Sequence, residues 1–180
     1  MKIGFIGAQS TGKTTILNLL HNALPHYQKC NEATRWVLEL GIEINENGSD
    51  LTQELILMKH LENLSLYDNM ITDRTLIDGY VYTKYLHSLG KVSDSVLEKT
   101  RSAMYRLIHK YDVIYYLPIE FELENDGVRS VDEEFRLEID KNFKELVQEL
   151  NKDYNIQTLT GSPQERLQTI KDKLGDINVH

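Results

Sequence analysis

The chain has 180 residues, of which 41% are hydrophobic and 27% charged, and its formal net charge is −8 from 28 acidic and 20 basic side chains. This length suits one domain over residues 1–180, the apolar content excludes a disordered chain, and no segment approaches the roughly 20 apolar residues of a membrane span. Long nucleic acid is a disfavoured partner, because its binding needs a basic face and the sequence has no run of Lys and Arg.

Short apolar segments alternate along the chain with longer segments of helical periodicity. This alternation predicts an α/β fold, a parallel sheet covered by helices on both faces, in which ligands bind beyond the carboxyl ends of the strands. We find no internal repeat or Pro/Gly-rich linker at which to divide the chain. The predicted strands are residues 2–6, 26–30, 70–73, 112–117 and 155–159.

The first predicted strand leads into a phosphate-binding loop. Residues 7–14, GAQSTGKT, fit the pattern G-x-x-x-x-G-K-[ST] between an apolar strand and an amphipathic helix. Glycines let the backbone amides turn toward phosphate oxygens, and the helix N-terminus adds its positive dipole end. We expect Lys13 to reach the β- and γ-phosphates of ATP and Thr14 to ligate Mg²⁺. The predicted nucleotide-binding residues are Gly7, Ala8, Gln9, Ser10, Thr11, Gly12, Lys13, Thr14 and Thr15.

The second predicted strand ends in Asn31-Glu32-Ala33-Thr34-Arg35-Trp36. A carboxylate and an arginine at this spacing share one face of a beginning helix and point into the cleft. Glu32 is a candidate base for an attacking hydroxyl, Arg35 a candidate for an anionic part of the substrate, and Trp36 a candidate for stacking. The alternative is an acidic first helical turn with Arg35 paired on the surface.

The third predicted strand ends in Asp73 and Arg74. An acid at this point of a phosphate-loop fold is expected to hold Mg²⁺, directly or through water, and Arg74 is a candidate for phosphate or substrate. The alternative for Asp73 is helix capping, a role that Thr75 fills equally well. Asp78 fits a solvated residue of the first helical turn.

Residues 121–136 are polar, include a glycine and lead into a helix. They predict a lid over the phosphates, with Arg129 and Arg136 on one side if the helix begins at Val131, and with a capping box of Ser130 and Glu133. The alternative is an acidic surface loop. Further along, Thr160-Gly161-Ser162-Pro163 suits either a place for the adenine ring or a helix cap, Arg166 is an outside candidate, and Gly175 predicts the end of the last helix.

Together, the segments GAQSTGKTT, EATR, ITDR, DGVRSVDEEFR and TGSPQERL resemble P-loop kinases of the nucleoside and nucleotide kinase group. They are most similar to the ribosylnicotinamide kinase domain of bacterial NAD-biosynthesis proteins and its stand-alone AAA-type ATPase-like relatives. The resemblance implies a five-stranded parallel sheet, ATP as donor, and a nucleoside-like acceptor. It implies the base and magnesium roles for Glu32 and Asp73, the substrate for Arg35, and a lid for Arg129 and Arg136. Asp73 is followed by arginine as in thymidylate and deoxynucleoside kinases, so the resemblance leaves the acceptor open.

The sequence therefore predicts an ATP- and Mg²⁺-dependent kinase acting on a small nucleoside or nucleoside monophosphate. A regulatory ATP-binding module and a kinase acting on nucleic acid are the alternatives. The start MKIGFIGAQ reaches glycine and polar residues too early for a secretory signal, and Cys30 has no second cysteine to pair with, so we expect a cytoplasmic protein without a membrane partner. The sequence leaves a homodimer open.

Overall fold

A five-stranded parallel sheet forms the centre of the molecule. The structure is a computed structural model that describes residues 1–122 and 132–177. The strands lie in the order β2-β3-β1-β4-β5, and neighbouring strands pair in parallel. Their bounds are β1 Lys2–Ile6, β2 Gln28–Cys30, β3 Met70–Asp73, β4 Val113–Tyr116 and β5 Ile156–Thr158.

The predicted strands are confirmed, two of them residue for residue. β1 and β3 have the expected bounds, and the other three are one or two residues shorter at one or both ends. β1 lies between β3 and β4, with Phe5 beside Asp73 and Ile6 beside Tyr116. The loop that follows Ile6 therefore begins next to the end of β3, which is where ligands bind in a parallel sheet.

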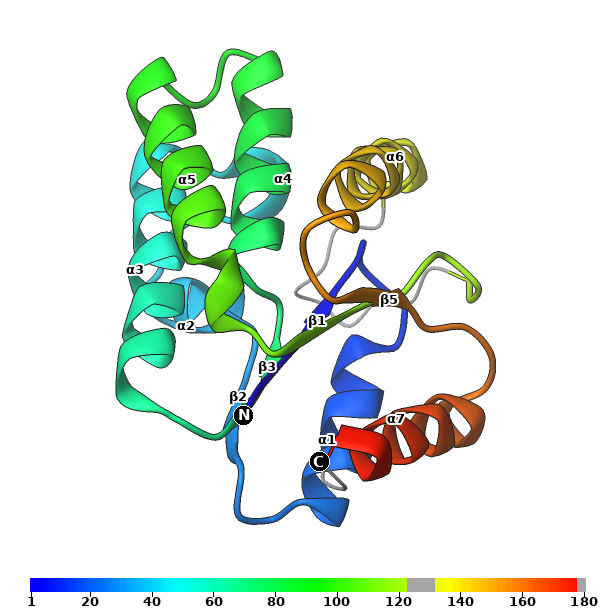
Figure 1. Ribbon diagram of the computed structural model, residues 1–180. Helices are drawn as coiled ribbons and strands as arrows, with labels where there is room; N and C mark the ends of the chain where they lie inside the picture. The colour runs from blue at the N-terminus through cyan, green and yellow to red at the C-terminus, as the bar shows by residue number, and fades with distance from the viewer. Residues whose placement is uncertain (123–131, 178–180) are drawn as a thin grey trace.

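Helices cover both faces of the sheet, as predicted. Figure 1 shows α1 and α7 on one face and α3, α4, α5 and α6 on the other. The bounds are α1 Lys13–Ala23, α2 Ala33–Glu39, α3 Asp50–Leu66, α4 Leu76–Ser88, α5 Asp94–Leu107, α6 Glu133–Leu150 and α7 Pro163–Ile177, with 3₁₀ turns η1 Asn45–Asn47 and η2 Ile108–Lys110. Within the described residues, none of the helices combines the length and the apolar character that crossing a membrane requires.

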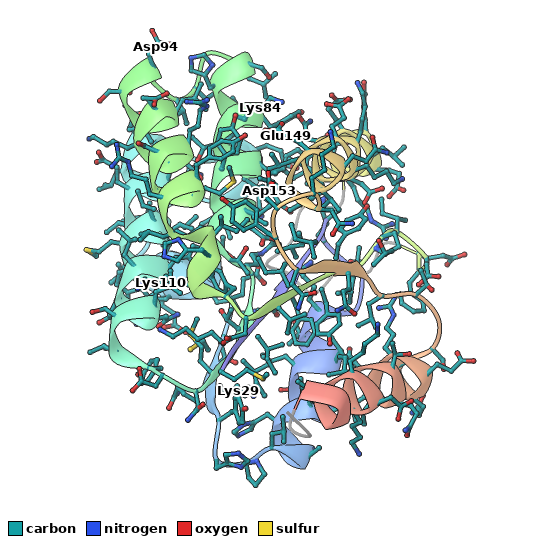
Figure 2. The ribbon with its side chains drawn as sticks, viewed as in Figure 1. Lys29, Lys84, Asp94, Lys110, Glu149 and Asp153 are labelled. Atoms are coloured by element: carbon teal, nitrogen blue, oxygen red, sulfur yellow. The ribbon has the colours of Figure 1, made fainter. Side chains whose placement is uncertain are left out.

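The strand side chains alternate between two apolar layers, because successive residues of a strand point to opposite faces. Ile3, Phe5, Val113 and Tyr115 pack against α1 and α7, whereas Ile114 belongs to the layer under α4 and α6. Figure 2 shows that Lys84, Asp94 and Glu149 lie on the exposed side of the outer helices. The buried layers hold the strands in place, and the candidate site lies at the carboxyl ends of these strands.

Two helix ends differ from the predicted ones. α6 begins at Glu133, and the Asp132 side chain caps it by accepting from the Phe135 N–H at 3.1 Å. Ser130 of the predicted capping box lies outside the described residues. An aspartate directly before the first turn satisfies the same exposed amides. α7 runs through Gly175 to Ile177, because Gly175 does not take the left-handed conformation that ends a helix.

The start of α7 agrees with its predicted cap. The Ser162 N–H donates to Glu165 Oε2 at 2.8 Å, and the Glu165 N–H donates to Ser162 Oγ at 3.4 Å. This reciprocal pair is a capping box. The capping box accounts for the residue types in Thr160-Gly161-Ser162-Pro163 without a role in binding adenine.

Candidate active site at the carboxyl edge of the sheet

The loop of residues 7–14 is tightly curled because three of its residues have positive φ. These are Gly7 at 141°, Ser10 at 55° and Gly12 at 87°. A Cβ on Gly7 would lie 2.4 Å from the Leu117 carbonyl oxygen, so only glycine fits beside β4. Gly12 is the N-cap of α1. The loop thus directs backbone amides and a helix N-terminus at one point, which is the geometry of an anion site.

Lys13 is buried against the inside of this loop. Its Nζ donates to the carbonyl oxygens of Gly7 at 2.8 Å and Ala8 at 2.5 Å, and to Thr11 Oγ1 at 3.3 Å. Burial and then the positive charge of Arg74 lower the pKa of Lys13 to about 7. A polyanion in the loop favours the charged form of this amine, so nucleotide binding and a charged Lys13 support each other.

Thr14 and Asp73 meet beside the loop. Thr14 Oγ1 donates to Asp73 Oδ2 at 2.5 Å. Within the described residues, the other carboxylate oxygen, Asp73 Oδ1, is buried and has no hydrogen-bond partner. Burial, followed by the negative charge of Glu32, raises the pKa of Asp73, so the carboxylate lacks a nearby counter-charge sufficient to offset its burial.

This pair fits a magnesium ion. Mg²⁺ prefers oxygen ligands and in phosphate-loop proteins keeps several waters, so it needs one or two protein oxygens plus the phosphates of the substrate. A hydroxyl beside a carboxylate with an unpartnered buried oxygen supplies that donor set. The described residues contain no cluster of three or more His, Cys, Asp or Glu side chains suited to a metal, and a hydrated Mg²⁺ on phosphate requires none.

Glu32 lies in a buried ion network with Arg74 and Asp78. Glu32 Oε1 accepts from Arg74 Nε at 2.5 Å, and Asp78 Oδ1 lies 3.3 Å from Arg74 Nη1. Although burial opposes the charge of Arg74, the carboxylate of Glu32 and its other neighbours raise the pKa of this guanidinium. Arg74 has a φ of 77°, an unfavourable value for a side chain with a Cβ. The strained backbone aims the guanidinium at Glu32.

Asp78 is not the solvated residue that its position suggested. It is 1% exposed, and its Oδ2 accepts from the Thr75 N–H at 2.8 Å, which completes a capping box at the start of α4. Burial raises the pKa of Asp78 to about 6. Thr75 is the N-cap of α4, so helix capping does not account for Asp73.

One cleft opens between β2, α2 and α3. It has a volume of about 340 Å³ and reaches from the Thr14–Asp73 pair past Glu32 to Arg35, Trp36 and Lys59. Arg35 Nε lies 3.9 Å from Glu32 Oε2, and Lys59 Nζ lies 5.7 Å from the centroid of the Trp36 ring. The expected face of Glu32, Arg35 and Trp36 is therefore present, with a second cation from α3. We call it the acceptor cleft.

A second cleft of about 200 Å³ lies on the other side of the loop. Its walls include Gly12, Thr14, Thr15, Phe121, Pro163 and Arg166. The Arg166 guanidinium lies over the Phe121 ring, with 4.9 Å between its carbon and the ring centroid. We call it the donor cleft, and Thr14 lines both clefts.

The predicted lid is only partly described. Arg129 lies outside the described residues. Arg136 is 1% exposed, and its guanidinium contacts the phosphate loop from behind, with Nε 3.1 Å from the Gln9 carbonyl oxygen and Nη2 3.4 Å from that of Ser10. Arg74, predicted for the substrate, lies beneath Glu32 rather than in the wall of the acceptor cleft.

Sequence reasoning assigned no site role to several residues that the fold brings to the clefts or to the ion network beside them. Tyr82 places its ring face 4.8 Å from the Arg74 guanidinium and donates from its hydroxyl to Gln9 Oε1 at 3.3 Å. Lys59 had no motif to mark it, and Phe121 was predicted only as the first residue of the lid segment. Arg166 was an outside candidate, and its contact with Thr11 appears only when α7 packs beside α1.

Comparisons with known proteins bear on the family and the fold. Residues 2–166 match the model of a family described as an AAA domain. No match was found among curated proteins. Solved structures with the same fold include deoxyadenosine kinase from M. mycoides with product dCMP and a flexible dCDP, with a TM-score of 0.74, 20% identity and coverage of 98% of this chain and 100% of that one. Thymidylate kinase from Candida albicans has a TM-score of 0.72 and 16% identity, with coverage of 98% and 92%.

The NadR protein in complex with NR is a third similar structure, with a TM-score of 0.67 and 17% identity. The match covers 89% of this chain and 44% of NadR, so this chain spans less than half of that protein. At these identities the likeness establishes the fold. The predicted P-loop fold and its resemblance to the nucleoside and nucleotide kinase group, NadR included, are confirmed at that level.

Proposed function

From the premise that this chain belongs to the AAA domain family, with the fold of the kinases above, we propose that it is an ATP- and Mg²⁺-dependent phosphotransferase acting on a small nucleoside or nucleoside monophosphate. The observation that carries the proposal is the pair of clefts that meet at Thr14. Hydrolysis of ATP alone needs only the donor cleft. A second cleft with a carboxylate in its wall suits an acceptor for the phosphoryl group.

The donor cleft and the phosphate loop would hold ATP. The amides of residues 7–14 and the N-terminus of α1 suit the triphosphate, and Lys13 has to leave the carbonyls of Gly7 and Ala8 to reach the β- and γ-phosphates. Phe121 and Pro163 lie in the wall available to the base. Mg²⁺ held by Thr14 and Asp73 would supply neutralisation of charge on the phosphates.

Glu32 is our proposed base, and Asp73 our proposed magnesium ligand. Asp73 contacts Thr14, whereas Glu32 lies deeper in the acceptor cleft and is held by Arg74. In the transfer to a nucleoside, the acceptor hydroxyl oxygen forms a bond to the γ-phosphorus as the bond from that phosphorus to the ADP oxygen breaks, and Glu32 accepts the hydroxyl proton. Arg35 and Trp36 are our proposed contacts for the rest of the acceptor.

The acceptor class follows from the chemistry of its cleft. Trp36 offers an aromatic face, and Arg35 and Lys59 offer cations at the end away from Thr14. A nucleoside, a deoxynucleotide and ribosylnicotinamide each combine a planar ring with polar sugar groups. These are also the kinds of substrate suggested by the names deoxyadenosine kinase and thymidylate kinase and by the NR bound to NadR.

Labelled ATP with Mg²⁺, incubated with a panel of nucleosides, their monophosphates and ribosylnicotinamide, tests the proposal. We expect ADP and a labelled phosphorylated product to form together, and only when the right acceptor is present. ADP formation at the same rate with and without every acceptor, with no labelled product, would contradict it. That result would favour the ATP-binding module, which capture of a protein partner only in the presence of ATP then tests.

A further inference from the structure

The carbonyl oxygens of residues 7–11 in the phosphate loop each accept a hydrogen bond from a cationic side chain. Lys13 Nζ donates to the carbonyls of Gly7 and Ala8. Arg136 lies beside the next two, with its Nε and Nη2 on the carbonyls of Gln9 and Ser10 at 3.1 and 3.4 Å. A loop that turns its amides toward a phosphate turns its carbonyls the other way, so these bonds accompany the anion-binding conformation.

Arg166 completes the set from the last helix. Its Nη1 donates to the Thr11 carbonyl at 2.6 Å, and its Nη2 donates to Glu120 Oε2 at 2.6 Å. The contact joins residues 155 positions apart in the sequence. The Arg136 and Arg166 side chains are each 1% exposed, so water does not compete at these bonds.

The loop itself is equally enclosed. Gln9, Ser10 and Thr11 are 2%, 7% and 0% exposed, so their carbonyls have little access to water as a substitute donor. A buried carbonyl without a donor is costly, and a donor with full charge binds more strongly than a neutral one. Donation to a carbonyl also polarises its peptide group, which strengthens the amide on the other side as a donor.

We propose that Arg136 and Arg166 are positioning residues that hold the carbonyls of Gln9, Ser10 and Thr11, and thereby keep the phosphate loop open for the triphosphate. The inference rests on the donor half of the proposed function and assigns these arginines to nucleotide affinity. Lys13 leaves its carbonyls when phosphate binds, whereas the two arginines stay in place and preserve the loop in both states.

This role differs from that of a lid cation that touches the transferring group. All three guanidinium nitrogens of Arg136 have protein partners, since Nη1 lies 3.3 Å from Glu133 Oε2 and Nη2 also donates to the Phe121 carbonyl at 2.7 Å. A positioning residue changes the affinity for ATP. A residue that contacts the transition state alone changes kcat and leaves that affinity as it was.

Calorimetry with ATP and Mg²⁺ on Arg136→Met and Arg166→Met tests the proposal without an acceptor. We expect the dissociation constant of ATP to rise about ten- to a hundredfold in each, because each change removes charged donors from buried carbonyls. Lysine variants at both positions keep the charge and one donor, so their dissociation constants should lie between those of wild type and the methionine variants. They also supply the answer if a methionine variant does not fold.

Hydrogen exchange of the loop amides measures whether the phosphate loop keeps its conformation in the variants. In the absence of nucleotide, the amides of residues 9–11 should exchange faster in both methionine variants, while those of the β1 core should not. Arg101→Met is the matched control, because Arg101 is a half-exposed arginine on α5 that pairs with Glu98 and stacks on Tyr105. It should leave both the ATP affinity and the loop exchange unchanged.

The inference is overturned if Arg136→Met and Arg166→Met bind ATP as wild type does, and in particular if kcat falls while that affinity stays constant. Failure of the proposed function has a different signature. Wild-type protein would then bind ATP but transfer nothing to any acceptor, or would not bind ATP at all.

Discussion

The donor and acceptor clefts stabilise their buried charges in opposite ways. Around the phosphate loop, Lys13, Arg136 and Arg166 point their charges at backbone carbonyls. Beside the acceptor cleft, Arg74 points its charge at the carboxylates of Glu32 and Asp78. Carbonyls do not titrate and carboxylates do. In the proposed function, the donor site therefore binds an anion in a preformed loop. The carboxylates of the acceptor site can in addition exchange protons with a substrate.

The largest expected effect comes from the cation that faces the phosphates. Lys13→Ala should lower kcat/KM for ATP about a thousandfold, because the change removes a charge from both the bound and the transferring phosphates. The fold should survive, because the main bonds that alanine removes are those from Lys13 to the carbonyls of Gly7 and Ala8. Steady-state rates and a far-ultraviolet circular dichroism spectrum measure the two outcomes.

Lys99→Ala is the matched control, because Lys99 is an exposed lysine that pairs with Glu54 on the outer helices. It should leave kcat/KM unchanged. Turnover by Lys13→Ala at more than a tenth of the wild-type rate would mean that the donor phosphates are held elsewhere.

The next largest effect should distinguish the two carboxylates that the sequence left as joint candidates. Glu32→Gln should lower kcat about a hundredfold by removing the proton acceptor, with the Mg²⁺ dependence of the rate unchanged. Asp73→Asn should raise the Mg²⁺ concentration needed for half-maximal rate, because Asp73 contacts Thr14. Initial rates across a Mg²⁺ series measure both. If the two variants exchange these behaviours, the assignment of base and metal ligand is reversed.

Arg74 should matter to stability as well as to activity. Arg74→Met removes the cation shared by two buried carboxylates, so we expect it to lower the free energy of unfolding by about 3–5 kcal/mol. Adding Glu32→Gln to Arg74→Met should recover part of this loss by removing one of the two buried negative charges. Urea unfolding followed by fluorescence measures the difference.

The exposed Arg101→Met should shift the free energy of unfolding by no more than about 0.5 kcal/mol. An equal effect of Arg74→Met and Arg101→Met would show that the network contributes little to the fold, and that Arg74 serves the acceptor alone.

The same contrast explains what could be predicted from the sequence. The phosphate loop is a contiguous segment of the sequence. Residues 7–14 are recognisable because the conformation of one short turn requires particular residue types at fixed positions. β1 and β3 were predicted residue for residue because their apolar runs are short and sharply bounded. Glu32 and Asp73 were found through the rule that strand ends meet at one edge.

Other parts of the site depend on packing that no local pattern records. The Arg166–Thr11 bond spans 155 positions, and the Arg74–Glu32 bond spans 42. Asp78 looked solvated because its position is exposed in an isolated helix, whereas in the folded chain it is 1% exposed and lies 3.3 Å from Arg74. The start of α6 was misplaced because aspartate and serine are both good helix caps, and the sequence offered both types just before the helix, where the structure has Asp132 as the cap.

The smallest predicted effect lies at Tyr82, which contacts both the phosphate loop and the buried ion network beside the acceptor cleft. Its hydroxyl donates to Gln9 in the phosphate loop, and its ring lies over Arg74 in the acceptor network. Tyr82→Phe removes only the hydroxyl, so we expect a loss of about 0.5–1.5 kcal/mol, up to about tenfold in ATP affinity, with the acceptor KM unchanged. Tyr82→Leu also removes the aromatic face and should raise the acceptor KM. If Tyr82→Phe changes the acceptor KM as much as Tyr82→Leu does, the two clefts are coupled through the hydroxyl, and their charges cannot be treated as two separate sets.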